Sequence, residues 1–344
     1  MGKRVRRTGG LAMVALAVLV GACGGGAQPE VGLAHDPFLE EQTVVDPDQP
    51  GLVTVEHSVQ VADGRRVHVT ESFTPSSWQR SPRRAVLLLS GTPTTGEFYN
   101  IDVDGYRGRE LLAEQGFFAV TADFEGSGES TFPEDGFSLT FDALTDSMRE
   151  VVDHVRRTRN VDRVDVLGEA EGGGVAMQLC ADEARVRSCT VSSMVFENGT
   201  EFFNAFFLSP FFQALIFGAP NGYLDITPDL YFNVLAAAPP DVASWVLANQ
   251  PGRYSMGMVA ESLIEMPSGY EPRNARVPGL IIRGEHDQNA PPSDTDALAA
   301  AYGSAAGAGP AEVVVIPGAL MIPRIEAPPH NEQFWQAVLD FLEP

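Results

Sequence analysis

The chain has 344 residues, of which 44% are hydrophobic, so it is long enough to build one large core or two small ones. Its 46 acidic residues outnumber the 23 basic ones and give a formal net charge of −23 at pH 7. A surface this acidic repels phosphate groups, which excludes nucleic acids and anionic lipid surfaces as binding partners.

The first residues have the features of an export signal. Four basic residues between positions 3 and 7 precede the apolar run 11–20, and small residues lead to Cys23. The apolar run is too short to span a bilayer as a mature helix. We therefore exclude this segment from the fold and treat it as a targeting signal.

The stretch Val-Gly-Ala-Cys that ends at Cys23 resembles the lipobox of bacterial lipoproteins. The resemblance implies that residues 1–22 are removed, that Cys23 carries a lipid, and that the protein is exported and anchored to the extracytoplasmic face of the cell membrane. The alternative is an ordinary secretory signal with an incidental cysteine. Residues 23–50 are rich in Gly, Pro and Asp without a period, which predicts a flexible tether.

Two runs of alternating apolar and polar residues lie between residues 52 and 73, separated by Ala62, Asp63 and Gly64. A period of two is typical of strands that bury one face, and Asp-Gly favours a tight turn, so this segment predicts a β-hairpin. The apolar run 84–90 indicates a buried strand. The next predicted elements are a helix over 108–115 and a strand over 117–124.

The alternation continues with a helix over 142–159, a strand over 163–168, a helix over 172–183 and a strand over 189–196. It is interrupted from about residue 197 to residue 276, a span far longer than ordinary loops. It resumes with a strand over 277–287, a helix over 293–302, a strand over 311–318 and a helix over 331–342. This order predicts an α/β domain over 51–344, with a mostly parallel central sheet, helices on both faces and an inserted cap.

Cys180 and Cys189 lie at the end of one predicted helix and the start of the next predicted strand. In an exported protein they form either a disulfide that closes this connection or two buried thiols. The six histidines are scattered, and neither Cys-x-x-Cys nor His-x-x-x-His spacing occurs. We therefore expect no metal site and no cofactor.

Five short motifs each follow the end of a predicted strand. In chain order they are SGTPTTG from Ser90, DFEGSGES from Asp123, GEAEGG from Gly168, RGEHD from Arg283 and IPGALMIPRIE from Ile316. Their order resembles the α/β-hydrolase superfamily over residues 52–344. The resemblance implies the fold of that superfamily, with a helical cap inserted at about 197–276.

In that superfamily a nucleophile, an acid and a histidine follow one another along the chain. The resemblance places Asp287 at the acid position, but it places Ala170 at the nucleophile position and Met321 at the histidine position. His330 is an alternative base, although prolines and a helix start separate it from the motif. Because a methyl group cannot attack and a thioether cannot take a proton, a conventional esterase or lipase is not expected.

The glycines that shape the turn at Ala170 remain, so we expect the backbone N–H groups of Thr92 and Glu171 to point at one spot, as in an oxyanion hole. The Glu171 side chain either reaches the pocket floor or contacts the helix dipole. Asp287 lacks an imidazole partner, so burial is expected to raise its pKa and suit it to acid–base work. The alternative for Asp287 is a structural acid bonded to backbone N–H groups.

Seven phenylalanines lie between residues 202 and 217, inside the predicted cap. Such clusters are typical of core packing, but a cap has little core of its own, so we expect an apolar substrate pocket. We predict that Phe202, Phe206 and Tyr99 line it, and Glu97 is a further candidate. Contact between the cap and a membrane is an alternative use of the phenylalanines.

The favoured hypothesis is an exported enzyme with a degenerate triad that acts on a bulky apolar small molecule without a covalent intermediate, as a lyase, isomerase or cyclase. Asp287 would then be the acid–base, and the amides of Thr92 and Glu171 would hold developing negative charge. The first alternative is a non-catalytic pseudoenzyme that binds an apolar ligand. The second is an atypical hydrolase in which Glu171 or His330 activates water.

Overall fold

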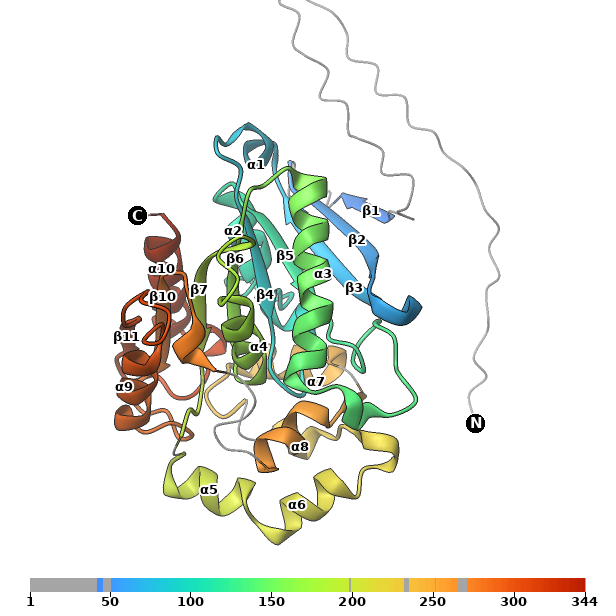
Figure 1. Cartoon of the computed structure of the whole chain (residues 1–344), viewed down its shortest axis with the longest axis vertical. Coiled ribbons are helices and arrows are strands. Elements are labelled where there is room, and N and C mark those ends of the chain that lie inside the picture. Colours follow the sequence, from blue (N-terminus) through green and yellow to red (C-terminus); the bar gives the residue numbers. More distant parts are fainter. Residues whose placement is uncertain are drawn as a thin grey trace, which may run out of the picture. The chain divides into compact units, whose positions relative to one another are not determined.

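A computed structural model describes residues 42–45, 51–197, 199–231, 235–250, 252–264 and 271–343 (Figure 1). All of them belong to the unit Asp36–Pro344. The export signal, Cys23 and most of the predicted tether lie outside the described residues. Within the part of the chain that is described, no helix is both long and apolar enough to cross a membrane.

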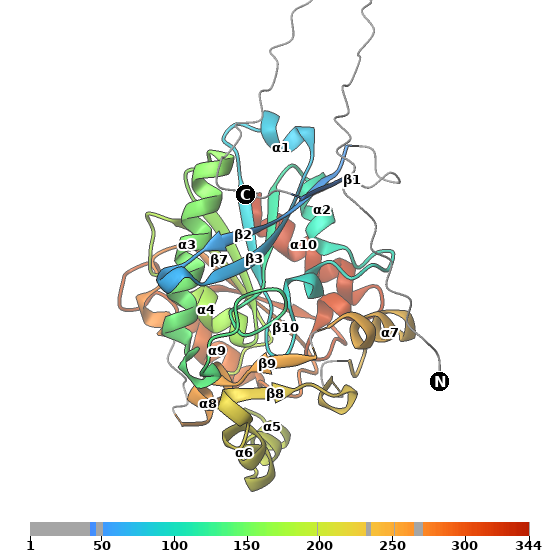
Figure 2. The ribbon, with the colours of Figure 1, turned by 90° about the vertical axis from the view of Figure 1, so that its right-hand side faces the viewer.

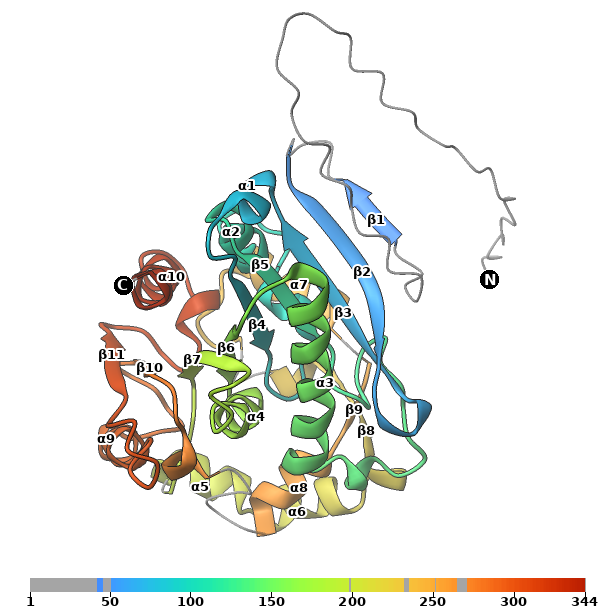
Figure 3. The same cartoon turned by 45° about the horizontal axis from the view of Figure 1, so that its top comes forward.

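Nine strands of the described chain form a central sheet (Figure 3). They are β1 (Gln42–Val45), β2 (Val53–Gln60), β3 (Arg66–Phe73), β4 (Ala85–Leu89), β5 (Phe118–Ala122), β6 (Val164–Glu169), β7 (Val186–Ser192), β10 (Gly279–Gly284) and β11 (Glu312–Ile316). Their spatial order is β1-β2-β3-β5-β4-β6-β7-β10-β11. The pairs from β5 to β11 are parallel, whereas β1, β2 and β3 run antiparallel to their neighbours. The mostly parallel sheet is confirmed.

Helices cover both faces of this sheet (Figure 3). On one face lie α3 (Phe141–Arg159), α4 (Glu171–Leu179) and α9 (Pro292–Ala301), which share a core with the strands. On the other face lie α2 (Gly108–Glu114) and α10 (His330–Leu342), which contribute Leu112, Phe334 and Trp335. The short helix α1 (Pro75–Gln79) follows β3. All the predicted helices are present, and every one except α4 lies within one residue of its predicted bounds.

The region between α4 and β7 differs from the sequence prediction. The helix ends at Leu179 rather than at residue 183, and the strand begins at Val186 and ends at Ser192 rather than covering 189–196. A turn occupies the connection because the Asp182 carboxylate accepts the Ala184 N–H at 3.1 Å and pairs with Arg185 at 2.5 Å. An aspartate side chain is short enough to accept a hydrogen bond from the backbone N–H two residues ahead. Such a bond favours a turn over a helix.

The N-terminal hairpin is confirmed. A third strand, which the sequence analysis did not predict, pairs with its first strand. β2 and β3 pair in register from Val53 opposite Phe73 to Gln60 opposite Arg66. Residues 42–45, which we assigned to the tether, form β1 and pair antiparallel with β2. The β-branched run Thr43, Val44 and Val45 suits an edge strand, which explains why the domain begins before residue 51.

The cap occupies the interruption between β7 and β10 (Figures 1 and 2). Its elements are α5 (Glu201–Phe207), α6 (Pro210–Phe217), β8 (Tyr223–Asp225), α7 (Pro240–Asn249), β9 (Arg253–Ser255) and α8 (Gly257–Ile264). β8 and β9 form a two-stranded antiparallel sheet. Helices α5, α6 and α8 lie together at one end of the central sheet, and they share an apolar cluster with β9.

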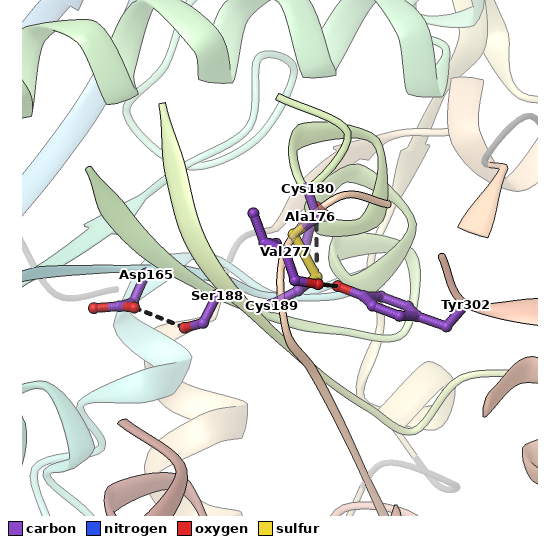
Figure 4. Close-up of a disulfide and its surroundings, with 7 residues drawn as sticks. All are labelled: Asp165, Ala176, Cys180, Ser188, Cys189, Val277 and Tyr302. Atoms are coloured by element: carbon purple, nitrogen blue, oxygen red, sulfur yellow. Dashed lines mark hydrogen bonds between the residues drawn. A yellow bond between two sulfur atoms is a disulfide. The ribbon is translucent and has the colours of Figure 1, made fainter. Parts of the chain in front are cut away.

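Cys180 and Cys189 form a disulfide, which resolves the alternative left open by the sequence (Figure 4). Their Cα atoms lie 6.0 Å apart, and both residues are buried in the core beneath α4. The bond therefore links the end of α4 to β7, beside the strand that leads to the Ala170 turn.

Candidate functional site

The turn at Ala170 keeps the geometry of a nucleophile elbow. Ala170 has φ 48° and ψ −123° between the end of β6 and the start of α4. A Cβ atom on Gly168 would lie 2.3 Å from the carbonyl oxygen of Gly172, and one on Gly172 would lie 2.4 Å from that of Leu89. Such close approaches admit glycine alone, so the strained turn is built into the fold although a methyl group occupies its apex.

The two amides predicted to form an oxyanion hole point at one spot, and the Glu171 carboxylate occupies it. The Thr92 N–H, just after β4, donates to Oε2 of Glu171 at 3.0 Å. The backbone N–H of Glu171 bonds the same carboxylate. Donors that would stabilise an oxyanion in a hydrolase are therefore already used within the chain.

The carboxyl of Glu171 lies at the floor of the cap, where the half-buried residue lines both cavities. Burial raises the pKa of Glu171, and the hydrogen bonds from the two amides lower it less than burial raises it. The neighbouring Glu169 carboxylate adds to the rise in this pKa. The two alternatives left open for Glu171 occur together: the side chain lines the pocket floor, and its carboxylate also accepts the first backbone N–H of α4.

Asp287 follows β10 and is held by the loop that it begins. Its Oδ1 atom accepts the Asn289 N–H at 2.7 Å and the Ala290 N–H at 3.2 Å. Burial raises the pKa of Asp287 to about 6, against the effect of these two amides. The residue is 8% exposed and is not among those that line the cavities under the cap. These two bonds match the alternative in which Asp287 is a structural acid held by backbone N–H groups.

Met321 lies at the position where the resemblance implies a histidine. It lines the cavity together with Ala170, and its sulfur contacts the side-chain amide of Asn289. The hydroxyl of Ser193, a residue with φ 57°, donates to the Met321 carbonyl at 2.5 Å. Asn289 and Met321 line the cap cavity, whereas Asp287 does not. Neither an amide nor a thioether side chain can take up a proton as an imidazole does.

His330, the alternative base, is the first residue of α10. Its Nδ1 atom lies 2.9 Å from Oε2 of Glu326, and its side chain is 24% exposed. His330 does not line either cavity under the cap. The structure therefore does not bring His330 together with Ala170.

An ion pair that the sequence did not predict links the histidine-position loop to the elbow. Arg324 donates to both carboxylate oxygens of Glu169 at 2.8 and 3.0 Å, and to the Phe98 carbonyl at 2.6 Å. Its guanidinium lies 4.2 Å from the ring centroids of Phe98 and Tyr99. Tyr99 is thus fully buried beneath Arg324 and does not line the cavity predicted for it. Arg324 lies within the motif IPGALMIPRIE, but the motif does not indicate its partner, because Glu169 lies 155 residues away.

Two apolar cavities lie between the cap and the elbow. The larger, called the cap cavity, has a volume of about 170 Å³. Its lining is Thr92, Pro93, Ala170, Glu171, Phe206, Phe207, Phe212, Ile216, Leu224, Ile226, Met256, Val259, Asn289 and Met321. A second cavity of about 80 Å³ shares Ala170, Glu171, Phe207 and Asn289 with it.

Several of the cap phenylalanines pack on one another beside the cap cavity. Phe203 stacks on Phe207 at 4.8 Å between ring centroids, and Phe206 lies 4.9 Å from Phe212. Phe206 lines the cap cavity as predicted, whereas Phe202 is 51% exposed and does not. A cavity of about 150 Å³ holds benzene, so the cap cavity suits one ring or a short alkyl chain rather than a bulky molecule.

A separate polar groove of about 980 Å³ runs beside β2 and β3, and it shares no residue with the cap cavity. Both acidic and basic side chains line it, among them Glu56, Arg66 and Asp123. Glu97 lines this groove and pairs with Arg109 at 2.5 Å. Glu97 is therefore not a residue of the cap cavity.

The fold also brings together a possible ligand set that the sequence spacing did not reveal. The ligand atoms of His57, Glu71 and His154, all buried, lie within 4.8 Å of one another. The Glu71 carboxylate, however, is 2.7 Å from Arg159 and 3.2 Å from His57. Because a guanidinium already neutralises the carboxylate, we interpret this cluster as a buried ion-pair network.

Comparison with known proteins gives the same fold. Residues 80–319 match the profile of a protein family described as "Serine aminopeptidase, S33". An esterase from Exiguobacterium antarcticum is 16% identical, with a TM-score of 0.60, over 83% of this chain and 99% of that one. A monoacylglycerol lipase from Paleococcus ferrophilus is 17% identical, with a TM-score of 0.59, over 80% of this chain and 98% of that one.

A third structure, E-2-(acetamidomethylene)succinate hydrolase, is 17% identical, with a TM-score of 0.58, over 85% of this chain and all of that one. No curated protein sequence matches the chain. Likeness at these identities establishes the fold, and the profile match covers most of the chain. The chain belongs to the serine aminopeptidase S33 family of α/β-hydrolases.

Proposed function

We propose that this S33 family member binds a small apolar molecule in the cap cavity and does not cleave acyl bonds through a covalent intermediate. The observation that carries the proposal is the hydrogen bond from the Thr92 N–H to the Glu171 carboxylate at 3.0 Å. Acyl transfer needs that donor for the oxyanion of its tetrahedral intermediate. Here an anion of the chain itself holds it, beside a methyl group instead of a nucleophile.

The placement of Asp287 also favours binding over the non-covalent catalysis that the sequence suggested. That hypothesis depended on an acid–base group in contact with the ligand. Asp287 does not line the cap cavity, and two backbone amides hold one of its oxygens. A general acid or base must come within hydrogen-bond reach of the proton that it transfers.

The second candidate function is proton transfer by Glu171 without a covalent step. One observation favours it: the carboxyl of Glu171 lines both cavities, and burial raises its pKa toward the range of an acid–base catalyst. Turnover of a bound ligand that is lost in Glu171→Gln would support this candidate. Binding without turnover supports the first.

We further propose that the protein acts on the extracytoplasmic face of the cell membrane, held there by a lipid on Cys23. The lipobox-like stretch at Cys23 supports this proposal. The Cys180–Cys189 disulfide supports the export part of it, because disulfides persist in oxidising compartments.

The proposed function is tested by calorimetry with 1-hexanol and benzyl alcohol, together with assays on p-nitrophenyl esters and a fluorophosphonate probe. We expect both alcohols to bind, without ester turnover or covalent labelling. Leu224→Trp, which fills the cavity, should weaken binding by about tenfold or more. Leu208→Trp is the matched control, because Leu208 belongs to the cap but is 47% exposed and outside the cavity lining.

Thermal melts establish that both tryptophan variants are folded. Binding that Leu224→Trp and Leu208→Trp weaken equally would place the ligand elsewhere. Stoichiometric phosphonate labelling of the wild type, or failure of both alcohols to bind, would overturn the proposal.

A further inference from the structure

A charged side chain lies on the largely apolar wall of the cap cavity. Among the described residues that line this cavity, Glu171 alone carries a formal charge, and the same holds for the described lining of the smaller cavity that shares this residue. The remaining polar members are Thr92, Asn289, Ser193 and Ser262. Any molecule that enters either cavity therefore meets a carboxyl group at the floor.

That carboxyl has hydrogen-bond donors but no cationic partner among the described residues. Its bonds are to the N–H groups of Thr92 and of Glu171 itself. The guanidinium of Arg324 is engaged by Glu169. The charge on Glu169 disfavours the ionised form of Glu171 further. Burying an anion without a counter-ion is costly, and a ligand that brings the cation relieves the cost.

We propose that the cap cavity recognises a small primary amine, whose ammonium group pairs with the Glu171 carboxylate while its apolar part lies among the cap phenylalanines. The inference rests on the proposed binding function and names its ligand class. An ammonium supplies donors and positive charge where the chain supplies acceptors and negative charge. It also implies that carboxylates, including fatty-acid anions, are excluded by repulsion between like charges.

The walls of the cavity support the same choice. Phe206, Phe207 and Phe212 line it, and the faces of aromatic rings attract ammonium groups. The formal net charge of −23 raises the local concentration of cations around the protein and lowers that of anions. A cavity of about 170 Å³ limits the apolar part to a short chain or one ring.

The experiment compares three ligands that share one alkyl chain: hexylammonium, 1-hexanol and hexanoate. Isothermal calorimetry at pH 7.5 gives a Kd for each with the wild-type protein. We expect hexylammonium to bind about tenfold more tightly than 1-hexanol, and hexanoate to bind more weakly than either. Increasing the salt concentration should change the difference little, because a buried pair is poorly screened.

Glu171→Gln removes the charge while keeping an oxygen that accepts the same amide hydrogen bonds, so the variant should lose the preference for the amine. Glu97→Gln is the matched control, because Glu97 lines the polar groove and not the cavity. We expect Glu97→Gln to leave the order of the three ligands unchanged.

The outcomes separate the two proposals. Binding of 1-hexanol without a preference for hexylammonium, or a preference that survives Glu171→Gln, would overturn the amine inference and leave the binding function standing. If none of the three ligands binds the folded wild type, the binding function itself fails.

Discussion

Oε2 of Glu171 accepts the Thr92 N–H at 3.0 Å, and this contact separates the protein from the acyl-transfer enzymes whose fold it shares. Loss of the serine and the histidine removes the reacting groups. Occupation of the amide donors by a carboxylate also removes the site that would stabilise the intermediate. The carboxylate in turn gives the cavity a polar floor, which suits recognition of a ligand better than attack on an ester.

Asp287→Asn should change the pH dependence of stability. The pKa of Asp287 is raised from 3.8 to about 6 by burial, so the folded state binds a proton more tightly than the unfolded state. The stability that this proton contributes is fully present below pH 3.8 and is lost as the pH rises through about 6. Relative to the wild type, Asp287→Asn should therefore gain about 2.5 kcal/mol in unfolding free energy between pH 4 and pH 7.5.

Urea unfolding of both proteins at the two pH values measures this difference, and the other titrating groups cancel in the comparison. A difference between wild type and Asp287→Asn that does not vary with pH would contradict the raised pKa.

Arg324→Met should destabilise the fold strongly. Removing the guanidinium leaves the Glu169 carboxylate buried at the elbow without a cation, at a cost of about 3–5 kcal/mol. Arg149→Met is the control, because it breaks an exposed ion pair with Asp146 and should change stability little. Chemical denaturation of the two variants checks the contrast, and equal effects would show that the elbow pair is not a structural link.

Breaking the disulfide should lower the free energy of unfolding by an amount that depends on the length of the loop that the bond closes. Cys180 and Cys189 are nine residues apart, and closing a loop of this size contributes about 2–3 kcal/mol in the chain-entropy account. The Cys180→Ser, Cys189→Ser double variant should therefore unfold at lower urea concentration than the wild type. Dithiothreitol should shift the wild type by a similar amount and the double variant not at all. Two free thiols per unfolded, unreduced chain would contradict the bond.

Cys23→Ser should release the protein from the membrane or leave its precursor unprocessed. The change removes the thiol that the lipobox-like motif supplies for lipid attachment. Fractionation of cells together with intact mass of the wild-type protein measures both membrane association and the lipid. An unaltered membrane fraction for Cys23→Ser would rule out this anchor.

The sequence was most informative where periodicity and glycine chemistry act locally. Apolar runs and alternation placed the hairpin, the parallel strands other than β7 and the long helix Phe141–Arg159 close to their observed bounds. The glycines around Ala170 revealed the elbow, because the close packing between Gly172 and Leu89 leaves no room for a side chain. These features depend on neighbouring residues, so a single sequence contains them.

The sequence was least informative where the site depends on contacts between distant segments. Nothing near Arg324 reveals that it pairs with Glu169, or that Tyr99 is buried beneath it. The carboxylate of Glu171 was predicted at the pocket floor or on the helix dipole, but its bond to Thr92 spans 79 residues. The size of the cap cavity likewise depends on how the phenylalanines pack on one another. The number and spacing of phenylalanines in the sequence do not determine this packing.

The central claim is that the Glu171 carboxylate fills the oxyanion position, and ester hydrolysis by a rebuilt triad tests it most directly. In the background Ala170→Ser, Met321→His, the substitution Glu171→Ala empties the position. Glu171→Gln instead removes the charge but keeps an oxygen on the amides. With both variants folded, we predict that kcat for p-nitrophenyl acetate is about 10²–10³ times higher with Glu171→Ala than with Glu171 or Glu171→Gln. Equal rates for all three proteins would contradict the claim.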